Sequence, residues 1–177
     1  MVQIIKDNQE LQYKINRYSD MLFKIAFLRL QNAQDAEDVV QEVFYQYIKR
    51  ESAFDSEEHE RAWLIKVTLN ACRKVWRSAW NRHRSGGEED MNTYSQDAEQ
   101  QGLEEGFLSV ESNRILLAAV KELPAKYRDV IHLFYYEELS IREISEVTGR
   151  KESTVTSQLT RGRELLKRRL KEEYDFA

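Results

Sequence analysis

The stretch from Leu139 to Leu170 constrains the fold most, because it predicts two helices joined by a tight turn. Ser140 and Glu143 have the spacing of a capping box at the start of the first helix. Gly149 follows the last apolar position of that helix and fits a turn with a positive φ angle. A longer amphipathic helix then follows. The pattern therefore predicts a helix-turn-helix at the C-terminal end of the chain.

The second helix of this stretch presents residues that suit a DNA groove. Its apolar positions form one stripe, and Ser153 or Thr154 is expected to cap its N-terminus. Hydroxyls and a helix N-terminus can contact phosphate, whereas Arg and Gln can reach base edges. The alternative is a solvated amphipathic helix pair. The candidate DNA contacts are Ser153, Thr154, Ser157, Gln158, Arg161 and Arg163.

Charge favours the DNA interpretation once it is resolved along the chain. The formal net charge is -4, but residues 150–171 carry eight Lys or Arg against two Glu. Residues 61–84 contain seven basic and no acidic residues, whereas residues 85–106 contain seven acidic and no basic residues. Two basic zones separated by an acidic zone are therefore hidden in the average.

Composition predicts an all-α protein, and the length allows either one domain or two small helical domains. The 177 residues are 41% apolar and 33% charged, with no long apolar run and no signal-peptide pattern, which favours a soluble cytoplasmic protein. Only one Pro and few alternating patterns occur, so strands are not expected. The single cysteine and three scattered histidines lack metal-ligand spacing. No catalytic motif is visible, so we expect no enzyme, metal, cofactor or small-molecule substrate.

The first domain, residues 1–84, contains three expected helices. Residues 18–30 predict a buried helix, and 32–35 a short connection. The next helix has an apolar stripe that includes Ile48, while Asp38, Gln41 and Glu42 occupy its surface. Acidic residues there suit a helix N-terminus and lack the partner spacing of a metal or acid/base site. They form either a surface for a basic partner or an ordinary solvated face.

A loop at 51–60 and a basic helix at 61–84 complete that domain. Phe54 is the only large apolar residue of the loop and could simply join the core. In the helix, basic residues alternate with aromatic ones, as expected where phosphates are neutralised and bases stack. Trp63 is expected to pack inward, whereas the pattern leaves both orientations open for Trp76 and Trp80.

An acidic linker, residues 85–106, precedes the C-terminal domain, residues 107–177. The linker is predicted to be flexible in the free protein, either as a plain tether or as a negative strand that occupies a nucleic-acid channel. Leu103 and Phe107 are expected near the start of the next ordered segment. Pro124 fits the first position of a helix, where its missing N–H is not needed.

Three segments resemble the sigma-70 family, in particular bacterial sigma factors of the extracytoplasmic-function group, over roughly residues 10–172. They are DAEDVVQEVFYQYIKR, AWLIKVTLNACRKVWR and LPAKYRDVIHLFYYEELSIREISEVTGRKESTVTSQLTRGRELLKRRL. The resemblance implies two helical domains and a role as an initiation subunit that brings RNA polymerase core to promoters and helps to melt DNA. It implies contacts with the coiled coil of the largest core subunit and with the flap, and inhibition by an anti-sigma factor that is often membrane-anchored.

The resemblance also assigns roles to residues. Asp38, Gln41 and Glu42 match the segment that docks on the core coiled coil. Phe54 and Asn70 match the elements that recognise the minus-ten sequence and hold an extruded base, and Arg73, Lys74 and Arg77 are our candidates for strand contacts nearby. The helix at 153–169 would read the minus-thirty-five element, and the linker would run toward the RNA exit path.

Two departures from the family pattern stand out. The loop around Phe54 is highly acidic, which is unexpected beside DNA. Many relatives carry basic residues where this chain has Thr156 and Gln158, so a promoter preference cannot be transferred. The rival interpretation is a stand-alone helix-turn-helix regulator that binds DNA as a dimer. It accounts for the C-terminal stretch but not for the acidic and basic helices of the first domain.

Overall fold

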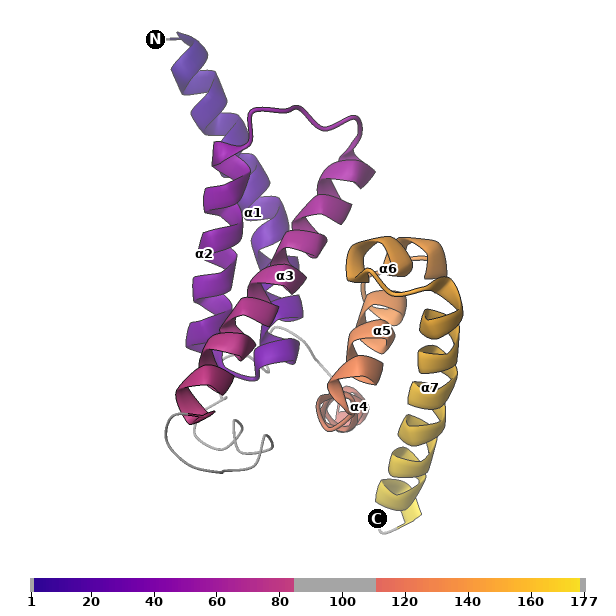
Figure 1. Ribbon diagram of the computed structural model, residues 1–177. Helices are drawn as coiled ribbons and strands as arrows, with labels where there is room; N and C mark the ends of the chain where they lie inside the picture. Colours follow the sequence, from indigo (N-terminus) through magenta and orange to yellow (C-terminus); the bar gives the residue numbers. More distant parts are fainter. Residues whose placement is uncertain (1, 85–110, 176–177) are drawn as a thin grey trace. The chain divides into compact units, whose positions relative to one another are not determined.

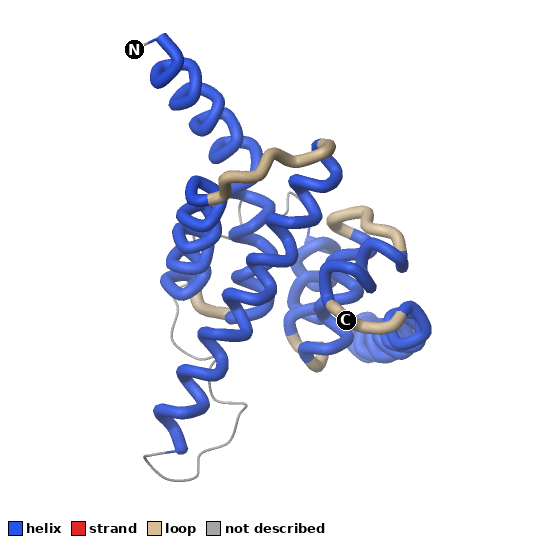
Figure 2. The backbone as a smooth tube through the Cα atoms, turned by 45° about the horizontal axis from the view of Figure 1, so that its top comes forward, coloured by secondary structure: helices blue, strands red, loops and turns tan. Residues whose placement is uncertain are grey.

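The computed structural model describes residues 2–84 and 111–175, and these form helices without any strand (Figures 1 and 2). The all-α prediction is confirmed. The chain divides into two units, one containing the first three helices and the other the last four. The predicted acidic linker, with Leu103 and Phe107, lies outside the described residues. The helices are α1 (Val2–Leu30), α2 (Ala33–Lys49), α3 (Glu57–Arg84), α4 (Glu111–Lys121), α5 (Ala125–Tyr135), α6 (Ile141–Thr148) and α7 (Glu152–Asp175).

In the N-terminal unit each helix packs against the other two. Large aliphatic side chains from all three helices are fully buried between them: Leu22, Val43, Leu64, Ile65 and Leu69. Helix α1 is longer than predicted, and its first turns extend beyond α2 and α3 (Figures 1 and 2). This arrangement leaves one side of α2 and one side of α3 open for other contacts.

Two boundaries in this unit differ from the predictions. The connection after α1 is shorter than 32–35, because the Asn32 side chain caps α2 by accepting a 2.9 Å hydrogen bond from the Asp35 N–H. The loop ends at residue 56 rather than 60, since α3 begins with acidic residues that suit the positive end of a helix.

Ile48 was predicted on the apolar stripe of α2 but is 58% exposed. It lies about 100° further round α2 than the half-buried Tyr47.

In the C-terminal unit, α7 packs against each of the other three helices. It approaches α5 closely at Gly162, where a Cβ atom would lie 2.9 Å from Cγ1 of Ile131. The predicted capping box of Ser140 and Glu143 is present at the start of α6. Gly149 ends that helix with a φ angle of 71°, also as predicted. The helix-turn-helix prediction is thereby confirmed.

Two helix starts in this unit differ from the predictions by one to three residues. Pro124 is the N-cap of α5 rather than its first residue. Helix α7 begins at Glu152, because the carbonyl of Lys151 already accepts from the Val155 N–H at 3.0 Å. Ser153 and Thr154 therefore lie inside the first turn and do not cap the helix.

Candidate nucleic-acid interface

Phe54 lies in an aromatic cluster at the start of α3. Its ring is half-buried and stacks with Tyr47 at a centroid distance of 5.9 Å, while Trp63 lies at 5.6 Å and His59 meets it edge-on at 5.5 Å. The guanidinium of Arg50 covers the Phe54 ring at 4.4 Å. Phe54 thus packs against the helices and the loop that carries it is held in place, rather than standing free in solvent.

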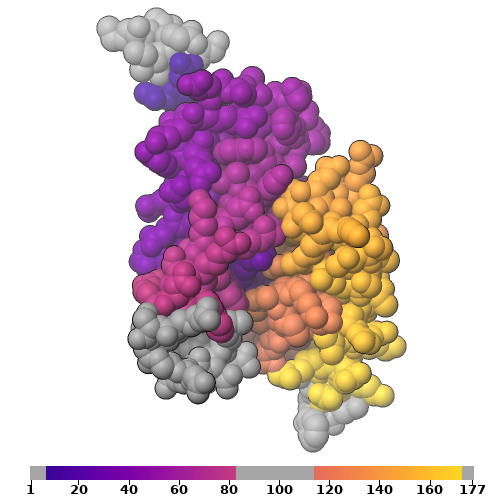
Figure 3. Space-filling model, in the orientation of Figure 1, coloured from indigo at the N-terminus to yellow at the C-terminus, as the bar shows by residue number. Residues whose placement is uncertain are grey.

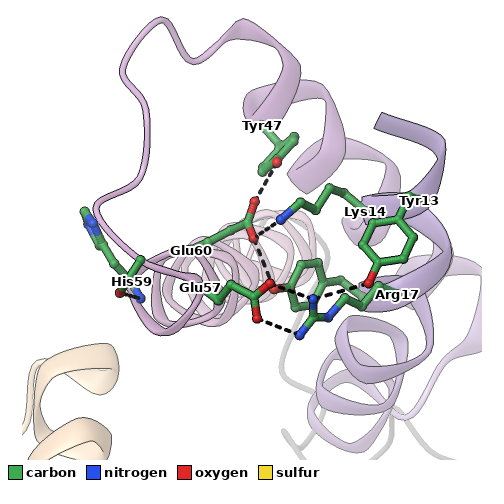
Figure 4. Close-up of polar contacts among 9 residues, drawn as sticks. Tyr13, Lys14, Arg17, Tyr47, Glu57, His59 and Glu60 are labelled. Atoms are coloured by element: carbon green, nitrogen blue, oxygen red, sulfur yellow. Dashed lines mark hydrogen bonds and ion pairs between the residues drawn. The ribbon is translucent and has the colours of Figure 1, made fainter. Parts of the chain in front are cut away.

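A buried carboxylate next to this cluster joins the three helices of the unit (Figure 4). Glu60 accepts hydrogen bonds from Lys14 Nζ at 2.7 Å, Tyr18 Oη at 3.1 Å and Tyr47 Oη at 2.6 Å. Burial raises the pKa of Glu60, but the hydrogen bonds from Lys14 and Tyr47 and the Lys14 charge outweigh burial and leave that pKa below its usual value. The hydrogen bond to Glu60 raises the pKa of Lys14. Glu60 is therefore ionised and shared by α1, α2 and α3.

Glu57, one turn earlier, also bonds to α1 (Figure 4). Its two carboxylate oxygens accept from Arg17 Nη1 and Nη2, each at 3.0 Å. These hydrogen bonds lower the pKa of Glu57. Two of the acidic residues that made this segment unlike its relatives are thus paired with α1, which accounts for part of that departure.

Sequence reasoning missed Glu60, although a signal was present. The buried positions of α3 include Leu64, Thr68 and Cys72, spaced by four residues. Counting back one step from Leu64 along this series reaches Glu60, which is 4% exposed. A carboxylate at a core position predicts a buried partner. The partner's identity was not readable, because Lys14 is 46 residues away.

Four predicted contact residues share one face of α3. Asn70, Arg73, Lys74 and Arg77 have the spacing i, i+3, i+4 and i+7, which places them on one side of a helix. Asn70, Lys74 and Arg77 are exposed, and Arg73 is half-buried. Arg73 Nη1 donates to Asn70 Oδ1 at 2.9 Å. The same face continues back to Trp63, seven residues before Asn70, and so to the Phe54 cluster.

The orientation of the last two tryptophans, left open by the sequence, is outward. Trp76 is 40% exposed and Trp80 is 45% exposed. Both flank the basic face of α3. Large aromatic surfaces beside basic side chains suit stacking on unpaired bases. Trp63, by contrast, is half-buried in the Phe54 cluster, in agreement with the prediction that it packs inward.

The predicted polymerase-docking residues share one exposed face of α2. Asp38, Gln41 and Glu42 are all exposed at the spacing i, i+3 and i+4. Tyr45 continues this face with 53% of its surface exposed, and the Lys49 ammonium lies 4.2 Å from its ring centroid. The structure therefore brings the three predicted residues together.

The space-filling view shows α7 at the surface of the C-terminal unit (Figure 3, amber to yellow). Most, but not all, of the predicted contacts lie on one side of this helix, here called its outer side. Ser153, Ser157 and Arg161 are exposed, and Thr154 is half-buried. Arg163 lies on the opposite flank, where its Nε donates to Tyr135 Oη at 2.6 Å. Arg163 is thus directed toward α5.

A second residue missed by sequence reasoning is Arg150, in the turn of the helix-turn-helix. Its guanidinium contacts the Asp129 carboxylate of α5 at 3.0 Å and the Gln158 side chain of α7 at 3.1 Å. Its backbone carbonyl accepts from Ser145 Oγ at 2.6 Å. The turn is therefore tied to α5, α6 and α7. The only sequence signal was a basic residue directly after the glycine of the turn.

Residues 2–84 and 111–175 contain no cluster of three His, Cys, Asp or Glu side chains able to hold a metal ion. Within the same ranges, no helix combines the length and the apolar character needed to cross a membrane.

Comparison with known proteins identifies both units. The sigma-70 region 2 family model matches residues 15–82, and the sigma-70 region 4 model matches residues 113–166. The ECF RNA polymerase sigma factor SigW of Bacillus subtilis is 30% identical over 163 residues, which cover 89% of this chain and 87% of that protein. The RNA polymerase sigma factor SigV of the same organism is 26% identical and covers 90% of each chain.

Solved structures agree in fold. A chain in the co-crystal structure of the sigma factor RpoE with the anti-sigma factor NepR from Bartonella quintana matches with a TM-score of 0.72 at 19% identity, over 92% of this chain and 98% of that one. A chain in the structure of CnrH with the cytosolic domain of CnrY matches with a TM-score of 0.62 at 21% identity, over 93% and 90%. Because the family models cover both units and SigW matches nearly the whole chain, the protein belongs to the sigma-70 family of RNA polymerase sigma factors, in its extracytoplasmic-function (ECF) group.

Proposed function

We propose that the protein is an alternative sigma factor that binds RNA polymerase core, directs it to specific promoters and helps to melt the DNA. The observation that carries this proposal is that sigma-70 regions 2 and 4 both match, in that order, on units that hold a basic helix face and a helix-turn-helix. The protein is then a specificity subunit of the polymerase and not itself an enzyme, so it needs no cofactor, metal or small-molecule substrate. It acts in the cytoplasm, where the polymerase is.

For core binding we propose Asp38, Gln41 and Glu42 as contacts with the coiled coil of the largest subunit. Their support is exposure on one face of α2 without internal ion pairs to Lys or Arg among the described residues. An acidic face attracts a basic partner and accelerates its association. We place a second contact, with the polymerase flap, on the C-terminal unit.

For the minus-ten element we propose Phe54, Asn70, Arg73, Lys74 and Arg77. Holding an extruded base requires unstacking, which costs a few kcal/mol and needs a prepared pocket with strand contacts nearby. The aromatic cluster holds Phe54 in a fixed position, and the basic face of α3 begins two turns after Trp63. The basic side chains would neutralise phosphates of the melted strand.

For the minus-thirty-five element we propose the outer side of α7: Ser153, Thr154, Ser157, Gln158 and Arg161. Arg163 was predicted with them, but its hydrogen bond to Tyr135 favours a structural role. A helix entering the major groove places phosphate contacts near its N-terminus and base contacts along its exposed side.

The two DNA-binding domains are proposed to span residues 1–84 and 107–177, joined by the linker at 85–106.

We also propose an anti-sigma factor as a partner. Such inhibitors are often membrane-anchored in this family, and an anchored inhibitor would hold the chain at the membrane face. The structure of RpoE from Bartonella quintana holds that protein in complex with the anti-sigma factor NepR. If an inhibitor also holds this chain, protein purified from unstimulated source cells should support less promoter-specific transcription with added core than the same amount of chain purified from a host that lacks the inhibitor. Equal activity of the two preparations would count against an inhibitor.

Promoter-specific transcription in vitro tests the main proposal. The purified chain with core polymerase should start transcripts at discrete sites on a fragmented genomic library, whereas core alone should not. The rival, a regulator that acts without polymerase, leaves the region 2 match at 15–82 unexplained and predicts no sigma-dependent start sites. Absence of such sites with active core would refute the sigma assignment.

The docking assignment has its own test. Asp38→Arg should lower the affinity for core polymerase, measured by fluorescence anisotropy of the labelled chain, because it reverses one of the two charges of the acidic face. Glu37→Arg is a matched control, since the same charge change falls on the same helix about 100° away. Equal core affinity for both variants would remove the docking assignment.

A further inference from the structure

The side chain of Gln158 is oriented by a cation. Arg150 Nη1 donates a 3.1 Å hydrogen bond to Gln158 Oε1. A guanidinium has donors only, so the end of the carboxamide that faces it must be the oxygen. The amide nitrogen of Gln158 has no hydrogen-bond partner in the described parts of the chain. What Gln158 has left to offer a ligand is therefore two N–H donors.

Arg150 is itself fixed from the opposite side. Its Nη2 lies 3.0 Å from Asp129 Oδ2, and its Nη1 also donates to the Lys126 carbonyl at 3.1 Å. The Asp129 side chain is only 5% exposed and that of Arg150 is 19% exposed. Charge-assisted bonds with a buried carboxylate hold a guanidinium in one orientation. The hydrogen bond to Gln158 thus comes from a rigid group.

The position of Gln158 on α7 makes this orientation relevant to DNA. Thr154, Gln158 and Arg161 have the spacing i, i+4 and i+7, so they follow one another along one stripe of the helix. Gln158 is half-buried between the turn and the outer side. A donor held there would meet the edge of a base rather than swing in solvent.

We propose that Arg150, held by Asp129, is a positioning residue that restricts Gln158 to hydrogen-bond donation, so that this position of α7 selects guanine over adenine. Gln usually reads adenine with both ends of its amide, accepting from N6 and donating to N7. With its oxygen occupied, that pairing is lost. Guanine instead presents two acceptors, N7 and O6, to the amide donors. The inference rests on the proposed reading of the minus-thirty-five element by α7.

The experiment uses the full chain in holoenzyme on a promoter library with a randomised minus-thirty-five element, followed by sequencing of the transcribed templates. The wild type should prefer guanine at one position, and Gln158→Ala should erase the preference there. A good bidentate contact corresponds to about five- to 150-fold discrimination. Arg150→Lys and Asp129→Asn should each shift this position toward adenine and leave the other positions unchanged. Arg142→Lys is the matched control, because Arg142 pairs with Glu146 on α6 and should leave the motif intact.

A second measurement uses only the unchanged protein and Gln158→Ala. Replacing the selected guanine by 7-deazaguanine removes the N7 acceptor, so it should weaken transcription by the wild type and not by Gln158→Ala. Preference of the wild type for adenine, or an Arg150→Lys variant with uniformly lower activity and an unchanged motif, would overturn the proposal. A wild type that transcribes without any minus-thirty-five preference would instead refute the proposed reading by α7, which separates the two failures.

Discussion

Replacing Glu60 by glutamine should destabilise the N-terminal unit far more than the same replacement at a neighbouring surface residue. Glutamine preserves the size of the side chain and one acceptor for Tyr47 or Tyr18, but it removes the charge that pairs with Lys14. The Lys14 side chain is only 15% exposed, so its ammonium would face an amide without compensation. Removing one partner of a buried ion pair costs about 3–5 kcal/mol, and the retained acceptor argues for the lower end, about 3 kcal/mol. That is a large share of the roughly 5–15 kcal/mol that stabilises a typical domain.

Tryptophan fluorescence during urea unfolding measures this effect selectively. All three tryptophans lie in α3, so the signal reports the N-terminal unit even if the C-terminal unit unfolds separately. Glu57→Gln is the matched control, because it makes the same change one turn away in a pair with Arg17 that is exposed to solvent. Exposed ion pairs contribute little. If Glu60→Gln and Glu57→Gln shift the urea midpoint equally, the buried network does not hold the three helices together.

The same network predicts a dependence of stability on pH. The pKa of Glu60 is lower in the folded protein than the usual value of 4.5, so its contribution is present above about pH 4.5 and is lost as the pH falls through the folded pKa. The pKa of Lys14 is raised above 10.5, so its contribution is present below that pH and is lost as the pH rises through the raised value. The difference in unfolding free energy between wild type and Glu60→Gln should therefore shrink below pH 4.5. A difference that persists undiminished at pH 3 would refute the ionised state of Glu60.

Three further predictions concern α7 and α3. Arg161→Ala should weaken DNA binding and reduce the slope of log affinity against log salt concentration by about 1. Arg163→Ala, which loses a hydrogen bond to Tyr135, should leave that slope unchanged. Equal slopes for the two variants would contradict the difference between the two flanks of α7. Gly162→Ala should lower the stability of the C-terminal unit by about 1 kcal/mol in thermal unfolding followed by circular dichroism, because overpacking costs about 1–3 kcal/mol and the gain in helix propensity returns about 1. Trp76→Ala should slow promoter opening, measured by permanganate reactivity of the melted DNA, and should leave the affinity for core unchanged. Unaltered opening would show that Trp76 does not stack on the melted strand.

Short-range signals account for what the sequence predicted well. The capping box of Ser140 and Glu143 and the left-handed Gly149 depend on residues within a few positions of one another, so the start and end of α6 were readable. The shared faces of α2 and α3 follow from helical periodicity alone. The errors at α7 and α2 are both displacements of a helix start by a few residues, because periodicity locates a helix better than it locates the helix end. At α2 the structure uses Asn32, and at α7 it uses no side-chain cap at Ser153 or Thr154.

Long-range pairing is what the sequence could not supply. Glu60 finds Lys14 across 46 residues, and Arg150 finds Asp129 across 21. Nothing in the local pattern around either residue specifies its partner, because many charged side chains could satisfy it. The outward orientation of Trp76 was equally hidden, since it depends on where the neighbouring helices end.

These pairings also decide what the net charge means for DNA binding. Glu57 and Glu60 carry negative charge near the Phe54 cluster. Arg17 and Lys14 of α1 neutralise these two carboxylates at donor–acceptor distances of 2.7–3.0 Å. From residue 61 to residue 84 the helix contains seven basic and no acidic side chains. Opposite charges in contact largely cancel at a distance, and salt screens the remainder over a Debye length of about 10 Å, so we expect the potential along α3 to follow its own basic side chains. An acidic protein can in this way present a basic helix face, and two of the acidic residues that set this chain apart from its relatives, Glu57 and Glu60, attach that helix to α1.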